Sequence, residues 1–288
     1  NNVVRWYSVL ALSDISGADV DKLLFQAMND EDWDVRNLAA KSFNRRKKPG
    51  VEPLIKVLNN EDINIRKGVI KAFVKIGDIK ALKQLTQALK HKDWIVRMRA
   101  AEVIGEIRDT KVVKILIQGL KDRNNIVRMK SAMSLGKIGG ARAIDLLIQT
   151  LNDKYRNVRR EASIALGIIG EKAIEPLIQV MKDKNSGLRL RREASIALGV
   201  IGEKAVKPLI QALRDKDMDI QWRVEETLRL IGDKAVEPLI QALNYNDRDI
   251  RMNAAMVLGN IGNKKAVKPL IKILKDEDDN VQEYAALA

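Results

Sequence analysis

Side chains able to do chemistry are few in this chain of 288 residues, which has no cysteine and one histidine, His91. Without cysteine there is no disulfide, zinc–thiolate site or cysteine nucleophile. A lone histidine in the polar stretch LKHKDW is typical of an inert turn residue. The sequence has no His-Glu pair, GxSxG, P-loop or GxGxxG. We therefore expect no catalytic residue, no metal and no cofactor.

Two polar residue types recur at regular intervals. The recurring aspartates are Asp93, Asp122, Asp153, Asp183 and Asp215. Paired carboxylates serve acid–base catalysis, but one catalytic pair needs no copy in every repeat, whereas aspartate commonly accepts hydrogen bonds from turn and helix-start N–H groups. The recurring arginines are Arg36, Arg66, Arg97, Arg128, Arg159, Arg191 and Arg251, a column that Gln221 interrupts. They form either a phosphate-gripping row or a structural ladder.

These residues belong to a repeat of about 31 residues, anchored at Leu23, Pro53, Gln84, Ile115, Leu146, Pro176, Pro208, Pro238 and Pro269. Each repeat predicts two helices. Proline is tolerated in a first helical turn, and Leu177, Ile178 and Met181 form one apolar stripe after it. The second helix ends at a glycine such as Gly202. No segment alternates polar and apolar residues, so the pattern predicts stacked hairpins without strands.

Glycines also recur inside the second helix, at Gly105, Gly136, Gly167, Gly199 and Gly259. Each costs about 1 kcal/mol against alanine, so their recurrence indicates a neighbouring helix that approaches closely. Arg229 replaces this glycine in one repeat, where we expect a looser contact.

The signature PLI, then Asp, then Val-Arg, then LGxIG resembles the HEAT-like repeats of the phycobilisome-lyase (PBS lyase) type over essentially the whole chain. The resemblance implies an all-α, right-handed α-solenoid of about nine stacked hairpins. It also implies that the arginines bridge to turn aspartates of neighbouring repeats, which favours the structural ladder. The family mixes lyases, hydroxylases, DNA-repair enzymes and plain scaffolds, so it does not select one function.

We expect one solenoid domain over residues 1–288. Residues 1–17 read as the second helix of an incomplete repeat, 18–266 as eight full repeats and 267–288 as a last repeat that is incomplete at its end. Neither end reads as a polar capping repeat, so we expect a piece of a longer protein. No stretch predicts a membrane span or signal peptide, and a cytoplasmic location is the default expectation.

The formal charge is +14, and residues 51–200 alone carry 30 Lys/Arg against 16 Asp/Glu. A basic centre can attract nucleic acid, an acidic protein or an anionic membrane surface, or can serve solubility alone. The run Arg45-Arg46-Lys47-Lys48 is read as an exposed loop between repeats.

One face of the second helices is unusual. In residues 92–108 the core stripe is Val96, Ala100 and Ile104, and positions offset by two residues lie about 200° round the helix. By resemblance this is the concave inner wall. Its apolar residues are Met98, Met129, Met133, Ile164, Ile168, Ile196, Val200, Trp222, Leu230, Met252 and Met256, and Arg99, Lys130, Arg160, Arg192 and Arg223 run beside them.

An extended apolar strip with a basic rim indicates an interaction site, unless a tightly curved solenoid buries it against itself. We therefore expect a non-enzymatic scaffold whose concave groove binds an amphipathic or acidic-hydrophobic protein segment within a larger assembly. Two alternatives stay open. One is a nucleic-acid-binding solenoid that uses the basic central repeats. The other is a bilin lyase-type subunit or another HEAT-repeat enzyme, which the family resemblance alone suggests.

Overall fold

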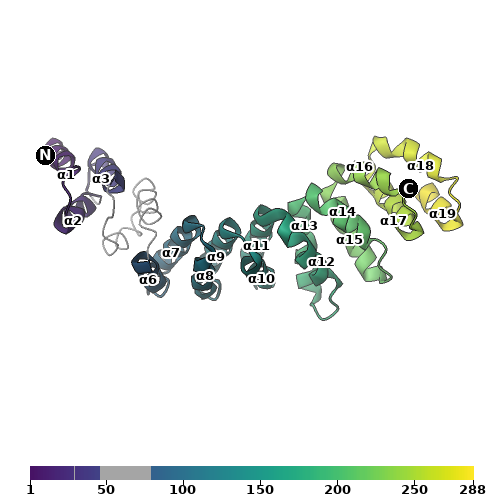
Figure 1. Cartoon of the computed structure of the whole chain (residues 1–288), viewed down its shortest axis with the longest axis horizontal. Helices are drawn as coiled ribbons and strands as arrows, with labels where there is room; N and C mark the ends of the chain where they lie inside the picture. The colour runs from purple at the N-terminus through teal and green to yellow at the C-terminus, as the bar shows by residue number, and fades with distance from the viewer. Residues whose placement is uncertain (29, 46–78) are drawn as a thin grey trace. The chain divides into compact units, whose positions relative to one another are not determined.

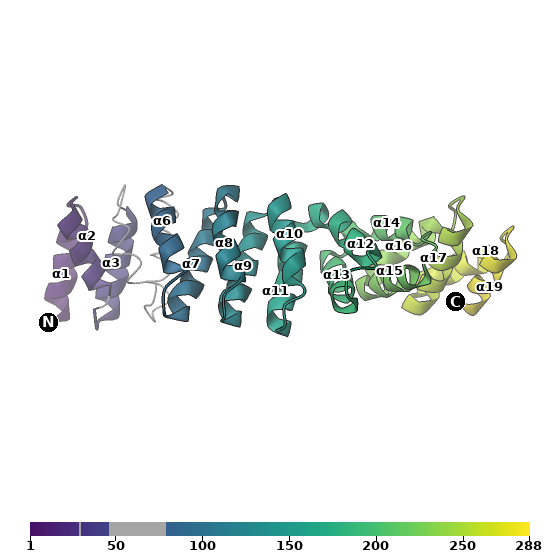
Figure 2. The same cartoon turned by 90° about the horizontal axis from the view of Figure 1, so that it is seen from below.

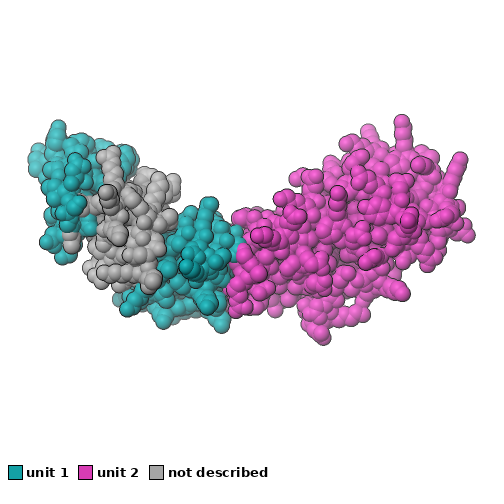
Figure 3. All heavy atoms as spheres, viewed as in Figure 1, with its two compact units in different colours: residues 1–139 teal, residues 140–288 magenta. Residues whose placement is uncertain are grey.

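A computed structural model describes residues 1–28, 30–45 and 79–288. It contains two compact units, Asn1–Gly139 and Gly140–Ala288, coloured separately in Figure 3. The described residues form α-helices and short 3₁₀ turns, with no strand among them. The predicted all-α solenoid class is confirmed. The anchor Pro53, the Arg45–Lys48 run and the ladder residue Arg66 lie outside the residues whose side chains are described. The prediction of a single uninterrupted domain stays a prediction.

Unit 1 contains helices that alternate between first and second members of hairpins (Figures 1 and 2). Its described elements are α1 (Asn2–Leu12), α2 (Ala18–Ala27), α3 (Trp33–Arg45), α6 (Ile79–Ala88), α7 (Trp94–Ile107), η1 (Thr110–Val112), α8 (Val113–Leu120) and α9 (Asn125–Ile138).

Unit 2 continues the alternation through five hairpins. Its elements are α10 (Ala141–Thr150), α11 (Arg156–Ile169), η2 (Gly170–Ala173), α12 (Ile174–Lys182), α13 (Leu188–Ile201), α14 (Glu203–Ala212), α15 (Met218–Ile231), α16 (Asp233–Ala242), α17 (Arg248–Ile261), η3 (Lys264–Ala266), α18 (Val267–Ile273) and α19 (Asp279–Leu287). In the described part of the chain, no helix has the length and apolar character needed to cross a bilayer.

Local sequence explains where the second helices begin and end. The Asp93 side chain accepts a hydrogen bond from the Ile95 amide at the start of α7, and Asp217 does the same for Asp219 at the start of α15. At the other end, Gly232 follows α15 with a φ of 69°. Arg108 takes the same place after α7 with a φ of 53°, a conformation that favours glycine. A residue with positive φ therefore follows both of these second helices.

The core of each hairpin is the apolar stripe that the sequence predicts. Val158, Ala162 and Leu166 of α11 are wholly buried, as are Leu177 and Met181 of α12. Burial of such side chains from both helices supplies the main stabilisation of each repeat.

Several helix-interior glycines lie where neighbouring helices approach. A Cβ on Gly105 would lie 2.9 Å from the Ser134 backbone, and one on Gly167 would lie 2.5 Å from Val200 Cγ1. The expected close approach is therefore observed at these two positions. At Gly199 a Cβ would make ordinary contact, 3.7 Å from Leu230.

The contact between α15 and α17 is looser than those between α11 and α13, α13 and α15, or α17 and α19. This is the junction at which Arg229 occupies the place of the helix-interior glycine. The looser contact agrees with the sequence expectation for a residue larger than glycine at this position.

Candidate functional site

The described ladder arginines of unit 1 are held by carbonyl and carboxylate groups. Arg97 donates through Nη1 to the carbonyl of His91, six residues earlier, at 2.8 Å. Its Nε and Nη2 donate to the two carboxylate oxygens of Asp122, 25 residues later in the next turn, at 2.6 and 2.9 Å. Both side chains are below 10% exposed. The pair therefore joins two successive repeats through a buried bidentate contact.

Asp122 has two roles in this contact. Its Oδ1 also accepts from the Asn124 amide at 2.8 Å, which shapes the turn before α9. Burial raises the pKa of Asp122, but the hydrogen bonds and the positive charge of Arg97 outweigh it, so the pKa lies below its usual range. The carboxylate is therefore stabilised in its charged form.

His91 stands in the turn where other repeats have an aspartate. Its Nδ1 accepts from the Asp93 amide at 3.1 Å, as Asp122 Oδ1 does for Asn124. The imidazole thus replaces a carboxylate as the turn acceptor. Among the described residues, no three histidine, aspartate or glutamate side chains cluster as metal ligands.

The same two contacts recur in unit 2 at Arg251. Its Nη1 donates to the Tyr245 carbonyl at 2.9 Å, and its Nε and Nη2 both donate to Asp276 at 2.9 Å. Contacts to the backbone carbonyl six residues earlier are also made by Arg36, Arg128 and Arg159. These guanidinium groups are engaged within the protein, which argues against a free phosphate-gripping row.

Two ladder arginines of unit 2 pair with carboxylates other than the turn aspartate. Arg159 donates to Glu193 at 2.7 Å and Arg191 to Asp219 at 2.6 Å. Both carboxylates lie on the second helix of the next repeat, α13 for Glu193 and α15 for Asp219, instead of in its turn.

The apolar strip is defined here as the unusual second-helix face of unit 2. Its members are Ile164, Ile168, Ile196, Val200, Trp222, Leu230, Met252 and Met256. Ile168, Trp222 and Leu230 are 58%, 55% and 56% exposed, while the others range from half-buried to exposed. Exposed apolar residues thus lie on the consecutive second helices α11, α13 and α15.

Only some side chains of the predicted basic rim are exposed and without an ion pair. Arg160 and Arg192 are exposed and have no ion pair with a described residue. The sequence places Arg223 beside the strip, but the structure buries it. It pairs with Asp219 at 3.2 Å and lies 5.7 Å from the centre of the Trp222 ring. Arg223 therefore contacts the Trp222 ring and does not provide an unpaired charge beside the strip.

The corresponding positions of unit 1 are less exposed than expected. Met98 is 8% exposed and belongs to the core, while Met129 and Met133 are half-buried. Arg99 pairs with Glu102 at 2.8 Å, and Lys130 Nζ lies 3.8 Å from the Met133 sulfur. The expectation of an open apolar wall is therefore wrong at Met98.

Two exposed residues of the same face were missed from the sequence. Leu188 and Met218 are 68% and 73% exposed. They lie four residues before Arg192 and Trp222, hence on the same side of α13 and α15. Extending the periodicity by one more turn toward each helix start finds them.

The stacked hairpins, the turn carboxylates and the arginine ladder define an α-solenoid protein. Residues 20–92, 82–167, 113–198, 144–229 and 206–288 match the model of the HEAT repeats. The chain therefore belongs to the HEAT repeat family, as its resemblance to HEAT-like repeats predicts. A sequence comparison with curated proteins finds no match.

Solved structures with similar folds come from proteins of different activities. The CpcE–CpcF complex of phycocyanin lyase from Nostoc is 23% identical, with 75% of this chain and 91% of that chain covered and a TM-score of 0.38. Yeast importin-β (Kap95p) is 13% identical, with coverage of 97% and 47% and a TM-score of 0.49. Human deoxyhypusine hydroxylase is 20% identical, with coverage of 82% and 93% and a TM-score of 0.36. None of these similarities carries a function over to this chain.

Proposed function

We propose that this protein is a non-enzymatic interaction scaffold and that the apolar strip binds an amphipathic or acidic-hydrophobic segment of a partner protein within a larger assembly. The single observation that carries the proposal is the exposure of Ile168, Trp222 and Leu230 on consecutive second helices. Contiguous exposed apolar side chains of this kind mark interaction surfaces.

The chemistry of the strip favours a helix with an apolar side. Second helices of neighbouring repeats lie about 10 Å apart, and seven residues of an α-helix rise about 10 Å. A partner helix that crosses α11, α13 and α15 can therefore place one apolar side chain per repeat. Met252 and Met256 suit such a surface because methionine repacks around varied partners.

The charges beside the strip favour acidic flanks on the partner. Arg160 and Arg192 are exposed and free of ion pairs with described residues, one on α11 and one on α13. A rim of this kind speeds association with an acidic segment and suppresses basic ones. Nucleic acid fits less well, since a groove for a phosphate backbone needs basic side chains and stacking aromatics where the strip has isoleucine and valine.

The test is a selection from a library of random helical peptides against the whole chain, with counter-selection on Ile196→Asp. Enriched peptides should carry apolar residues about every seven positions and acidic residues between them. They should lose at least about tenfold in affinity for Ile196→Asp and for Trp222→Ala.

Two results contradict the proposal. One is enrichment of peptides that bind the Ile196→Asp variant equally well. The other is submicromolar binding of random duplex DNA at 150 mM salt with a steep salt dependence, which selects the nucleic-acid alternative instead.

A further inference from the structure

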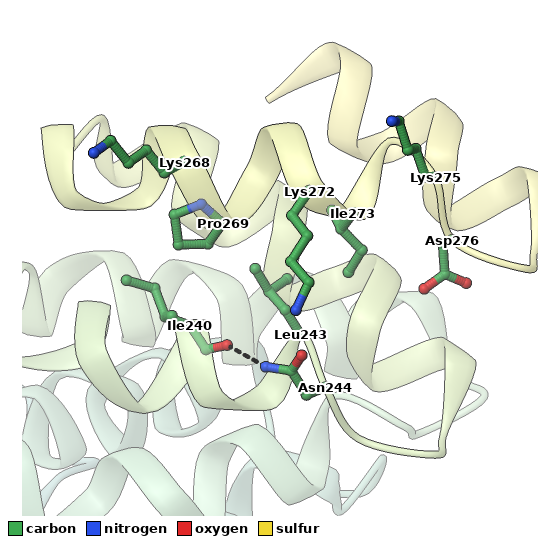
Figure 4. A pocket seen from close by; sticks show the side chains of 9 residues that line it. All are labelled: Ile240, Leu243, Asn244, Lys268, Pro269, Lys272, Ile273, Lys275 and Asp276. Carbon is green, nitrogen blue, oxygen red and sulfur yellow. Dashed lines mark hydrogen bonds between the residues drawn. The ribbon is translucent and has the colours of Figure 1, made fainter.

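A groove lies in unit 2 between the first helices α16 and α18 (Figure 4). It encloses about 500 Å³, and its apolar lining comes from Ile240, Leu243, Pro269 and Ile273. Leu243 and Ile273 are below 10% exposed, so they form a floor and not a rim. A volume of this size falls in the range of roughly 300–1,000 Å³ that ligand sites occupy.

The groove follows from unequal packing of the two helix layers. The second helices α17 and α19 pack closely: a Cβ on Gly259 would lie 2.5 Å from Ala288 Cα. The first helices α16 and α18 have fewer close approaches than α14 and α16. Because the last hairpin packs closely against the preceding repeat only on the second-helix side, a gap remains between the first helices α16 and α18.

The polar lining of this groove is basic. Lys272 points into it toward the Asn244 side chain, while Lys268 and Lys275 lie on its rim and point away (Figure 4). None of these three lysines forms an ion pair with a described residue. Asp276 also borders the groove, but both its oxygens accept from Arg251 at 2.9 Å. The groove therefore has unbalanced positive charge above an apolar floor.

Lys272 departs from the repeat pattern. Three residues after the anchor, most first helices have glutamine, and these residues are Gln26, Gln87, Gln118, Gln149, Gln179, Gln211 and Gln241. The other lysine at this position is Lys56, which lies outside the described residues. In the preceding hairpin, the positions equivalent to these three lysines hold Glu237 and Gln241 on α16 and Asn244 just after it. The helix α18 is thus more basic than the helix that it faces.

We infer that the α16–α18 groove binds an acidic amphipathic helix of a partner protein. Its apolar side chains fill the floor, and a carboxylate pairs with Lys272. Charge complementarity argues for this occupant. Lys268 and Lys272 are spaced at i and i+4 on α18, about 6 Å apart along the helix axis, and Lys275 follows in the turn after it. Glutamates at a similar spacing on a helix that lies alongside can therefore approach them. The site does not depend on the apolar strip, which lies on second helices.

The test uses a synthetic helical peptide of about 18 residues, roughly 27 Å long, with leucines on one side and glutamates at i, i+4 and i+7 beside them. The chain has no cysteine, so Ile271→Cys, at an exposed position of α18 outside the groove lining, gives a unique site for an environment-sensitive dye beside the groove. Asn260→Cys gives a second site on the second-helix face. Saturable binding with a Kd of about 10 µM is expected at the groove dye.

Lys272→Gln is the decisive variant, since glutamine is the native residue at most equivalent positions and should leave the fold intact. It should weaken binding by about three- to tenfold. Lys234→Gln removes the same charge from an exposed site outside the groove lining and should leave Kd unchanged. A peptide with glutamine in place of glutamate should bind more weakly than the acidic one.

Trp222→Ala separates this site from the apolar strip, because it should leave the signal of the groove dye unchanged. The inference is overturned by an absence of saturable binding at the groove dye. It is also overturned by equal losses for Lys272→Gln and Lys234→Gln, or by equal affinity of the acidic and neutral peptides.

Discussion

Gln221 and Tyr245 both depart from the arginine–aspartate pattern of the ladder, and they do so at the same junction. Gln221 stands at the ladder position of α15, and Tyr245 stands in the following turn where Asp122, Asp215 and Asp276 stand elsewhere. Gln221 keeps the backbone contact of the ladder, since its Nε2 donates to the Asp215 carbonyl six residues earlier at 2.7 Å. The junction that lacks the arginine therefore also lacks the carboxylate that would pair with it.

This junction is the looser one between α15 and α17, and two further residues distinguish it. Arg229 replaces the helix-interior glycine, and Glu225 occupies a position where Ser163, Ser195 and Ala255 are buried. Larger and charged side chains thus replace small ones on the side of α15 that faces the next repeat. We interpret this junction as the weakest in unit 2.

The ladder can be restored at this junction. Gln221→Arg or Tyr245→Asp alone should change the free energy of unfolding little, because each lacks its partner. Together they should stabilise the protein by about 1 kcal/mol more than the sum of the single changes. Urea unfolding of the four proteins measures this coupling, and additive single effects would show that the two positions do not meet.

Removal of an existing ladder pair should be costly. Arg97→Ala leaves the Asp122 carboxylate buried without its cation, so the free energy of unfolding should fall by about 3 kcal/mol. Arg5→Ala removes an arginine of the same column whose side chain is 35% exposed, and should cost much less. Equal losses in chemical denaturation would contradict the assignment of Arg97–Asp122 as a buried pair.

Two glycines of one column should respond in opposite directions to alanine. Gly105→Ala puts a Cβ within 2.9 Å of the Ser134 backbone, and the forced shift should destabilise by about 1–3 kcal/mol. Gly199→Ala makes ordinary contact with Leu230 at 3.7 Å. It should therefore stabilise by up to about 1 kcal/mol through helix propensity. Thermal melts of the two variants give the signs directly, and a shared sign would refute the close-approach argument.

The fourth test concerns Glu225, whose pKa burial raises to about 7. A carboxyl group with a higher pKa in the folded state binds its proton more tightly there. Its charged form therefore destabilises the fold, and stability falls as the pH rises from about 4.5 to about 7. Glu225→Gln should raise the free energy of unfolding by about 1–2 kcal/mol at pH 8, after allowance for its partial exposure, and change little near pH 4.5.

Unfolding of both proteins in urea at the two pH values measures this difference. If Glu225→Gln stabilises equally at pH 8 and pH 4.5, the gain comes from packing and not from titration.

The sequence predicts the periodic part of this structure and misses the parts that depend on lateral packing. The helices, the glycine that ends most second helices and the core stripe follow from local geometry that each repeat carries. Burial of Met98 and Arg223 was not predictable in this way, because it depends on how closely one second helix approaches the next. The α16–α18 groove is not predicted for the same reason. From the sequence alone Lys272 is an ordinary solvated lysine, and only the spacing between the two first helices places it in a groove.

The last prediction separates surface from core on a single helix. Trp222 is 55% exposed, whereas Val224, two residues later on α15, is wholly buried. Trp222→Ala should change the free energy of unfolding by well under the 3–5 kcal/mol that loss of a core tryptophan costs, while Val224→Asp should unfold unit 2 because it buries an unpaired charge. Ile196→Asp, on the exposed side of α13, should keep the helical circular dichroism signal and a cooperative melt. If Ile196→Asp or Trp222→Ala instead unfolds the protein, the apolar strip is part of the core, and the proposed binding surface is lost with it.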